Sequence, residues 1–213
     1  MSEQDISAQL FLVVEAGDSA RDRLSAALAA ARIASVLIVP PTGRDLSLAE
    51  VQPLIAAAQA HGSAALLPDA ELARLAKADG VHLRHSDDIA ADFRDARAKV
   101  GAGAIIGGHA GSSRHDAMML GELGADYIAF GLPRDVASED AARGQRFELV
   151  QWWAEIFEVP CIAFDVEDNR GIIDLAEAGV DFIGISLPTG ISPADAAERV
   201  RQVADTLSAA EVG

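Results

Sequence analysis

The densest group of side chains that could do chemistry is the segment Arg84-His-Ser-Asp-Asp88. Carboxylate and imidazole groups that converge on one loop can hold a divalent metal ion. Alternatively, Asp87 or Asp88 caps a helix beginning at Ile89, because aspartate is a preferred residue immediately before a helix. The residue types alone leave both interpretations open.

His109 follows a pair of glycines and is a candidate catalytic residue. An imidazole in such a place can donate or accept a proton during a reaction. The alternative is a polar side chain whose hydrogen bonds are satisfied by a neighbouring acid such as Asp69 or Asp87. Further polar candidates follow other apolar runs: Glu15, Thr42, Ser112, Ser113 and Thr189.

Basic and hydroxyl side chains are candidate contacts for an anionic ligand. Arg44 and Arg134 would supply positive charge, and Ser186 would supply a hydroxyl group. Residues 164–168, in contrast, include the three carboxylates of Asp165, Glu167 and Asp168. These would repel a phosphate directly, so a conventional phosphate cup is not expected there.

The elements that position these residues are indicated by a phrase that occurs three times, at residues 75–82, 120–127 and 175–182. Each copy ends a helical pattern near a glycine, which supplies the left-handed residue that stops a helix. A short apolar run rich in β-forming residues follows at once. Repetition of helix and then strand is typical of an α/β protein with a parallel sheet.

Eight apolar runs are predicted to be strands, and each is followed by a predicted helix. We expect the strands at residues 10–14, 35–39, 64–67, 81–83, 104–107, 127–130, 161–164 and 182–185. We expect the helices at residues 19–31, 48–61, 70–78, 89–100, 114–123, 147–157, 171–178 and 193–210. Eight such units most simply close as one (β/α)8 TIM barrel domain over residues 1–213. The runner-up, an open doubly wound sheet, lacks its glycine-rich turn after the first strand.

Three local predictions depend on this layout. Residues 132–146 are polar and charged and are predicted to be the longest loop, of the kind that forms lids or binding loops. His82 alternates with apolar neighbours inside a strand and is interpreted as structural. Cys161 lies in an apolar run and is expected to be a small buried residue.

Composition narrows the classes of partner. The chain has 33 acidic residues against 17 Lys and Arg, a net charge of −16, which repels nucleic acid and anionic membranes. It shows no signal-peptide pattern at its start and no apolar stretch near the roughly 20 residues that span a bilayer. With one cysteine and no disulfide framework, a cytoplasmic location is expected.

The ordered motifs resemble the superfamily of thiamine phosphate synthases, which includes thiazole tautomerase-like proteins. Residues 78–83 followed by Asp87 resemble the signature Ala-Asp-Gly-Val-His-Leu-Gly-Gln-x-Asp. Further matches follow in order over nearly the whole chain, at residues 105–107, 124–128, 159–163 and 178–181. The resemblance implies a TIM barrel transferase of thiamine biosynthesis that joins a pyrimidine-methyl pyrophosphate to a thiazole phosphate, uses Mg²⁺ and forms a homodimer.

The resemblance also assigns roles to residues. Asp87 matches a magnesium carboxylate, and a shift of one residue recruits Asp69 as the second. His109 replaces a family serine and would sit beside the leaving group, while Arg44 and Arg134 would compensate for absent basic residues.

Several family motifs are replaced in this sequence. The Gln-x-Arg-x-Lys motif falls on Ile38, Pro40 and Thr42, and the threonine-rich loop ending in lysine is replaced by residues 131–135. The Gly-Gly phosphate turn falls on Asp165-Val166. Each lost charge-assisted contact removes about 1.5–3 kcal/mol of phosphate binding.

Two hypotheses for function follow. The first is a divergent thiamine phosphate synthase-like transferase that acts on phosphorylated small molecules. The second is a barrel that has lost the transferase and binds another small ligand or serves as a non-catalytic partner. The replaced residues favour the second hypothesis, and the ordered family match favours the first.

Overall fold

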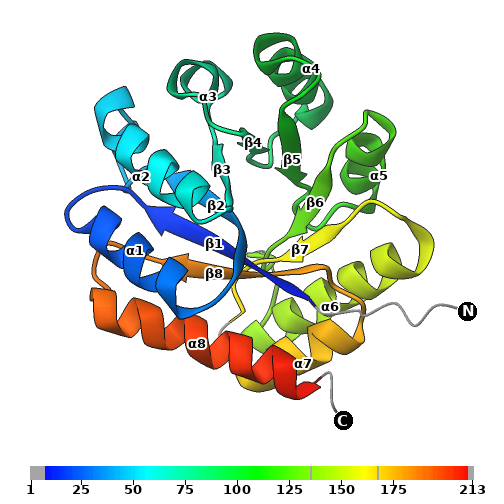
Figure 1. Ribbon diagram of the computed structural model, residues 1–213. Helices are drawn as coiled ribbons and strands as arrows, with labels where there is room; N and C mark the ends of the chain where they lie inside the picture. Colours follow the sequence, from blue (N-terminus) through cyan, green and yellow to red (C-terminus); the bar gives the residue numbers. More distant parts are fainter. Residues whose placement is uncertain (1–7, 135, 167, 211–213) are drawn as a thin grey trace, which may run out of the picture.

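The protein folds as a closed barrel of eight parallel strands in the order β1 to β8, surrounded by helices (Figure 1). The computed structural model describes residues 8–134, 136–166 and 168–210. Strand β1 pairs with β2 on one side and with β8 on the other, which closes the sheet. The predicted (β/α)8 barrel is confirmed, and the open sheet is excluded.

The observed elements lie close to the predicted ones, mostly within one or two residues at each end. The strands are Gln9–Glu15 (β1), Ile33–Val39 (β2), Ala64–Leu67 (β3), Gly80–Leu83 (β4), Ile105–His109 (β5), Tyr127–Phe130 (β6), Cys161–Ala163 (β7) and Phe182–Leu187 (β8). The helices are Ala20–Ala30 (α1), Leu48–Ala60 (α2), Ala70–Ala76 (α3), Ile89–Val100 (α4), Arg114–Glu122 (α5), Glu139–Ile156 (α6), Asn169–Glu177 (α7) and Pro193–Ala210 (α8).

The prediction of one long loop over residues 132–146 is wrong in its second half, because helix α6 begins at Glu139. The Ser138 hydroxyl accepts the Ala141 N–H at 3.2 Å and so caps the new first turn. Acidic residues in that turn stabilise the helix, because their negative charge lies near the positive end of the helix dipole. The polar composition misled the prediction because this turn is exposed and because Arg146, a charged residue, is buried.

The aspartate of the repeated phrase binds backbone groups at the amino-terminal edge of the barrel. The carboxylates of Asp79, Asp126 and Asp181 accept a backbone N–H from the first or second residue of a neighbouring strand, at 2.7, 2.7 and 2.8 Å. Each bond ties the start of one strand to the loop that enters the next. The aspartate that recurs in the three copies of the phrase therefore has the same role in each, which is to align two adjacent strands.

The barrel interior is filled by side chains from alternate strand positions. Phe11, Leu37, Leu66, Tyr127, Ala129, Ile162 and Phe164 form this inner cluster. Glycines make room for the aromatic rings: a Cβ atom at Gly107 would lie 2.2 Å from the Tyr127 ring, and one at Gly184 would lie 2.2 Å from the Phe164 ring. The filled interior leaves a floor near the carboxyl ends of the strands.

Cys161, Trp153 and Trp152 belong to the hydrophobic core between the sheet and the helices. Cys161 is fully buried, as expected, and burial raises the pKa of its thiol to about 12. Trp153 packs in the core and donates its Nε1–H to the Val159 carbonyl at 2.6 Å. Trp152 is partly buried beneath the Arg114 guanidinium. Among the described residues, no helix has the length and hydropathy needed to cross a membrane.

Candidate active site at the barrel mouth

The carboxyl ends of the strands surround a polar mouth. Two cavities of about 560 and 350 Å³ open there and share His82, Arg84, His109, Arg134 and Asp165 in their walls. Spaces of this size are typical of sites for small molecules. In barrels of this class, the reacting groups come from these strand ends and the loops that follow them.

Strand periodicity decides which side chains face the mouth. His82 points inward while its neighbours Val81 and Leu83 pack outward in the helix-facing core, and Arg84 continues the inward row. By the same alternation, Ser186 faces the mouth from the end of β8. Because successive residues alternate, a one-residue shift of β4 would turn Arg84 away from the mouth.

His109 is fixed as a neutral hydrogen-bond donor. The Gly111 backbone N–H donates to Nδ1 at 2.9 Å, so the ring proton resides on Nε2. Burial lowers the pKa of His109, and the electrostatic effect of the neighbouring His85 acts in the same direction. Protonation of Nδ1 would also break the bond from Gly111. This geometry suits donation of a hydrogen bond better than the proton exchange that was one reading of the sequence.

The acid near His109 is neither Asp69 nor Asp87, the two neighbours considered from the sequence. Asp165 raises the pKa of His109 electrostatically and lies with it over Gly131. A Cβ atom at Gly131 would lie 2.6 Å from His109 Nε2 and 3.2 Å from Asp165 Oδ2. The missing side chain at Gly131 is what lets the two groups approach.

His82 is part of the mouth as well as of the core. Its Nδ1 lies 2.8 Å from the Tyr127 hydroxyl, and burial lowers its pKa to about 3. The structural interpretation of His82 is consistent with this bond, yet the ring also lines both cavities. It forms a neutral polar floor beneath the charged groups.

Arg84 and Arg134 bring positive charge to the mouth. Both side chains are exposed, and neither forms an ion pair or hydrogen bond with any residue of the described ranges. Sequence reasoning placed Arg134 among the ligand contacts but counted Arg84 only in a metal cluster. The position of Arg84 two residues after His82, on the same strand face, was the signal that could have identified it.

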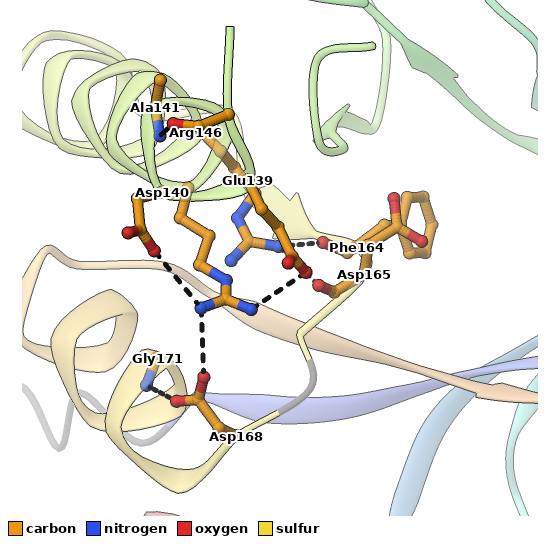
Figure 2. A network of polar contacts seen from close by, with 10 residues as sticks. Glu139, Asp140, Ala141, Arg146, Phe164, Asp165, Asp168 and Gly171 are labelled. Carbon is orange, nitrogen blue, oxygen red and sulfur yellow. Dashed lines mark hydrogen bonds and ion pairs between the residues drawn. The ribbon is translucent and has the colours of Figure 1, made fainter. Parts of the chain in front are cut away.

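Asp165 adopts a left-handed backbone conformation, with φ of 59°. Asp is one of the few residues other than Gly that occupy this region at modest strain. The buried Arg146 guanidinium donates to the carbonyls of Phe164 and Asp165 and fixes the turn from the α6 side (Figure 2). The Asp165 carboxylate accepts the Leu132 N–H at 3.3 Å.

The start of α6 is also linked to the start of α7 by an ion pair. Arg143 pairs with Glu139 at 3.0 Å and reaches Asp168 at 3.9 Å, across to α7 (Figure 2). The Asp168 carboxylate also caps α7 by accepting the Gly171 N–H at 2.7 Å. Of the three acids predicted after β7, Asp165 faces the mouth, Asp168 is structural, and Glu167 lies outside the described residues.

Arg44, Asp69 and Asp87 do not line these two cavities, although Asp69 lines an adjoining cavity together with Arg84 and His85. Arg44 pairs with Glu50 at 2.5 Å and lines a groove beside α1 and α2. Asp69 accepts the Leu72 N–H at 2.6 Å as the cap of α3. Asp87 is exposed and is not among the residues that line the two cavities, while Asp88 caps α4.

These positions bear on the expected magnesium site. Within the described part of the chain, no group of three or more His, Cys, Asp and Glu side chains is placed to hold a metal ion. One oxygen of Asp69 is already committed to the helix cap. The described donors therefore do not fit a metal site built by the protein alone.

The fold and the polar mouth define a TIM-barrel protein with a small-molecule site at the carboxyl ends of its strands. Residues 10–187 match the family described as thiamine monophosphate synthase, and the chain belongs to this family.

Curated relatives support the assignment. The chain is 37% identical to a thiamine-phosphate synthase of Erythrobacter litoralis over 194 residues, 87% of this chain and 90% of the relative. A thiamine-phosphate synthase of Rhodospirillum centenum is 37% identical over 76% of this chain and 78% of its own. These relatives support a thiamine phosphate synthase-like function and do not favour a barrel that has lost it.

Solved structures confirm the fold. A thiamine phosphate pyrophosphorylase from Pyrococcus furiosus superposes with a TM-score of 0.72 at 17% identity, over 97% of this chain and 98% of that one. A structure described as native KDPGal superposes with a TM-score of 0.69 at 11% identity, over 99% and 97% of the two chains.

Proposed function

We propose that the mouth joins a pyrimidine-methyl pyrophosphate to a thiazole phosphate, the reaction that the family resemblance implies. The observation that carries the proposal is the set of Arg84, Arg134 and His109 around one cavity. Two unpaired guanidinium groups and one N–H donor can bind phosphate oxygens through charge-assisted hydrogen bonds.

The reaction requires groups that stabilise the negative charge of the departing pyrophosphate. The bond between the pyrimidine methylene carbon and the pyrophosphate oxygen breaks, and the electron pair leaves with pyrophosphate. The thiazole nitrogen then uses its lone pair to form the new carbon–nitrogen bond. Arg84 and Arg134 stabilise the leaving charge, and His109 Nε2–H donates to it, in a mouth that lies above a floor of packed aromatic rings.

Two expectations from the family stay predictions of this proposal. Magnesium binding was assigned to Asp87 and Asp69, but no step is derived through a metal here because the described donors do not form a site. A homodimer is expected, and light scattering coupled to size-exclusion chromatography tests it.

The experiment is a transferase assay that measures thiamine phosphate and pyrophosphate with both substrates present, across a range of Mg²⁺ concentrations. We expect turnover, and we expect Arg134→Gln to lower kcat/KM at least tenfold, a loss of about 1.4 kcal/mol. Arg170→Gln is the matched control, since Arg170 is exposed on α7, does not line the two mouth cavities and should leave the rate unchanged. Absence of product at every magnesium concentration, with the protein folded, would overturn the proposal.

A further inference from the structure

We propose that the mouth sorts its ligand by charge, with Arg84 and Arg134 taking the phosphate end and Asp165 selecting a cationic heteroaromatic ring. The inference rests on the proposed function and names three specificity-determining residues of the same site. The ligand class is a positively charged or amine-bearing aromatic ring that carries a phosphate tail.

The positive groups occupy one arc of the mouth. Arg84 extends from β4, His109 ends β5, and Arg134 follows β6, and these three strands are neighbours in the barrel. Arg84 stands where the family signature quoted above has a glycine.

The next arc carries the opposite charge. Asp165 follows β7 and lines both cavities. A phosphate placed on this arc would meet a like charge at short range, which is strongly unfavourable in a partly desolvated site. The anionic tail is therefore directed to the arc of Arg84 and Arg134.

The arc of Asp165 instead suits a positive ring. The Phe164 ring lies in the wall beside the carboxylate, and Ser186 adds a hydroxyl from β8. An aromatic wall with one adjacent carboxylate attracts a cationic heterocycle through its ring face and its charge. Positive charge develops on the pyrimidine during the proposed reaction and persists on the thiazolium product, so Asp165 would stabilise it.

The conformation of the turn is compatible with this role. Arg146 holds the two carbonyls at residues 164 and 165, which fixes the direction in which Asp165 leaves the backbone. The variant Asp165→Asn keeps a residue that tolerates the left-handed region and removes only the charge. It is therefore the appropriate perturbation.

The test is isothermal titration calorimetry on the full chain with three probes: thiamine monophosphate, unphosphorylated thiamine and inorganic pyrophosphate. We expect Arg84→Gln to weaken thiamine monophosphate and pyrophosphate at least tenfold and to change thiamine less than twofold. We expect Asp165→Asn to weaken thiamine and thiamine monophosphate at least fivefold and to leave pyrophosphate unchanged or bound more tightly. Asp174→Asn on exposed α7 is the charge-matched control and should change none of the three.

The outcomes separate this inference from the proposed function. Equal losses for all probes in both variants, no loss in either, or no binding of any probe to the unaltered chain would overturn the charge sorting. The expected binding pattern without any transferase turnover would support the charge sorting and overturn the proposed reaction. Transferase turnover together with a thiamine affinity that Asp165→Asn leaves unchanged would support the proposed reaction and overturn the charge sorting.

Discussion

Replacing Gly131 with alanine should disturb the site while preserving the fold. The new Cβ atom would lie 2.6 Å from His109 Nε2 and 3.2 Å from Asp165 Oδ2, and the first distance is too short for any real contact. Gly131 is not among the residues with positive φ, so alanine adds no backbone strain there. The effect of the substitution therefore reports the clash with the imidazole.

The magnitude follows from what His109 must give up. To make room, the ring shifts and loses the 2.9 Å bond from the Gly111 N–H, worth about 0.5–1.5 kcal/mol. Overpacking of a tight site costs about 1–3 kcal/mol, and the ring sits at the movable end of a side chain, which favours the lower part of that range. We expect the free energy of unfolding to fall by about 1–2 kcal/mol, or the Tm by roughly 2–8 °C.

Urea denaturation of a double-mutant cycle measures this coupling. Gly131→Ala should cost about 1–2 kcal/mol in the native background and close to nothing in a His109→Ala background. Gly144→Ala is the control, because that exposed helical glycine has no atom within 4 Å of its built Cβ and should gain about 0.5–1 kcal/mol. An equal cost of Gly131→Ala in both backgrounds would refute the reasoning.

Three further predictions concern His82 in the floor of the mouth, Arg146 on α6 and Asp69 at the start of α3. The pKa of His82 is lowered to about 3, so the unfolded state binds the extra proton below pH 6.5 and stability should fall with falling pH by up to about 1.4 kcal/mol per unit. Urea midpoints at pH 7 and 5 should differ less in His82→Gln than in the native chain or in His61→Gln, and an unchanged difference would contradict this. Arg146→Met should lower the free energy of unfolding by about 2–3 kcal/mol because two carbonyls lose a charged donor, whereas Arg143→Met, with partly exposed ion pairs, should cost under about 1 kcal/mol. Asp69→Ala should cost about 0.5–2 kcal/mol by the same measurement, since its carboxylate caps α3.

The fold could be predicted closely because its signals are local. Glycine near several helix ends, short β-forming runs and capping residues such as Ser113 act within a few positions along the chain. The turn at Ser138 was missed because exposed and polar residues dominate it and because the charged Arg146 is buried, where it donates to the carbonyls of Phe164 and Asp165 after β7. A sequence pattern of polar residues does not distinguish a solvated loop from a helix with one long buried arginine.

The residues of the site were harder to sort because every strand end offers a polar side chain. His109, Arg134 and Ser186 meet at the mouth, whereas Arg44, Asp69 and Asp87 are placed elsewhere. Sequence reasoning could not separate these groups, since a carboxylate that caps its own helix and one that faces a ligand look the same in the chain.

The amino-acid sequence by itself determined the eight repeated units, their parallel order and the membership in the family, because these depend on short-range patterns that recur along the chain. Only the tertiary structure decided that Arg84 and Arg134 remain unpaired near His109 and that Asp165 lines the same cavity from the neighbouring strand β7. The reason is geometric: closure of the barrel and the alternation of its strands bring together residues that lie far apart in sequence, and no local pattern records which of them will meet.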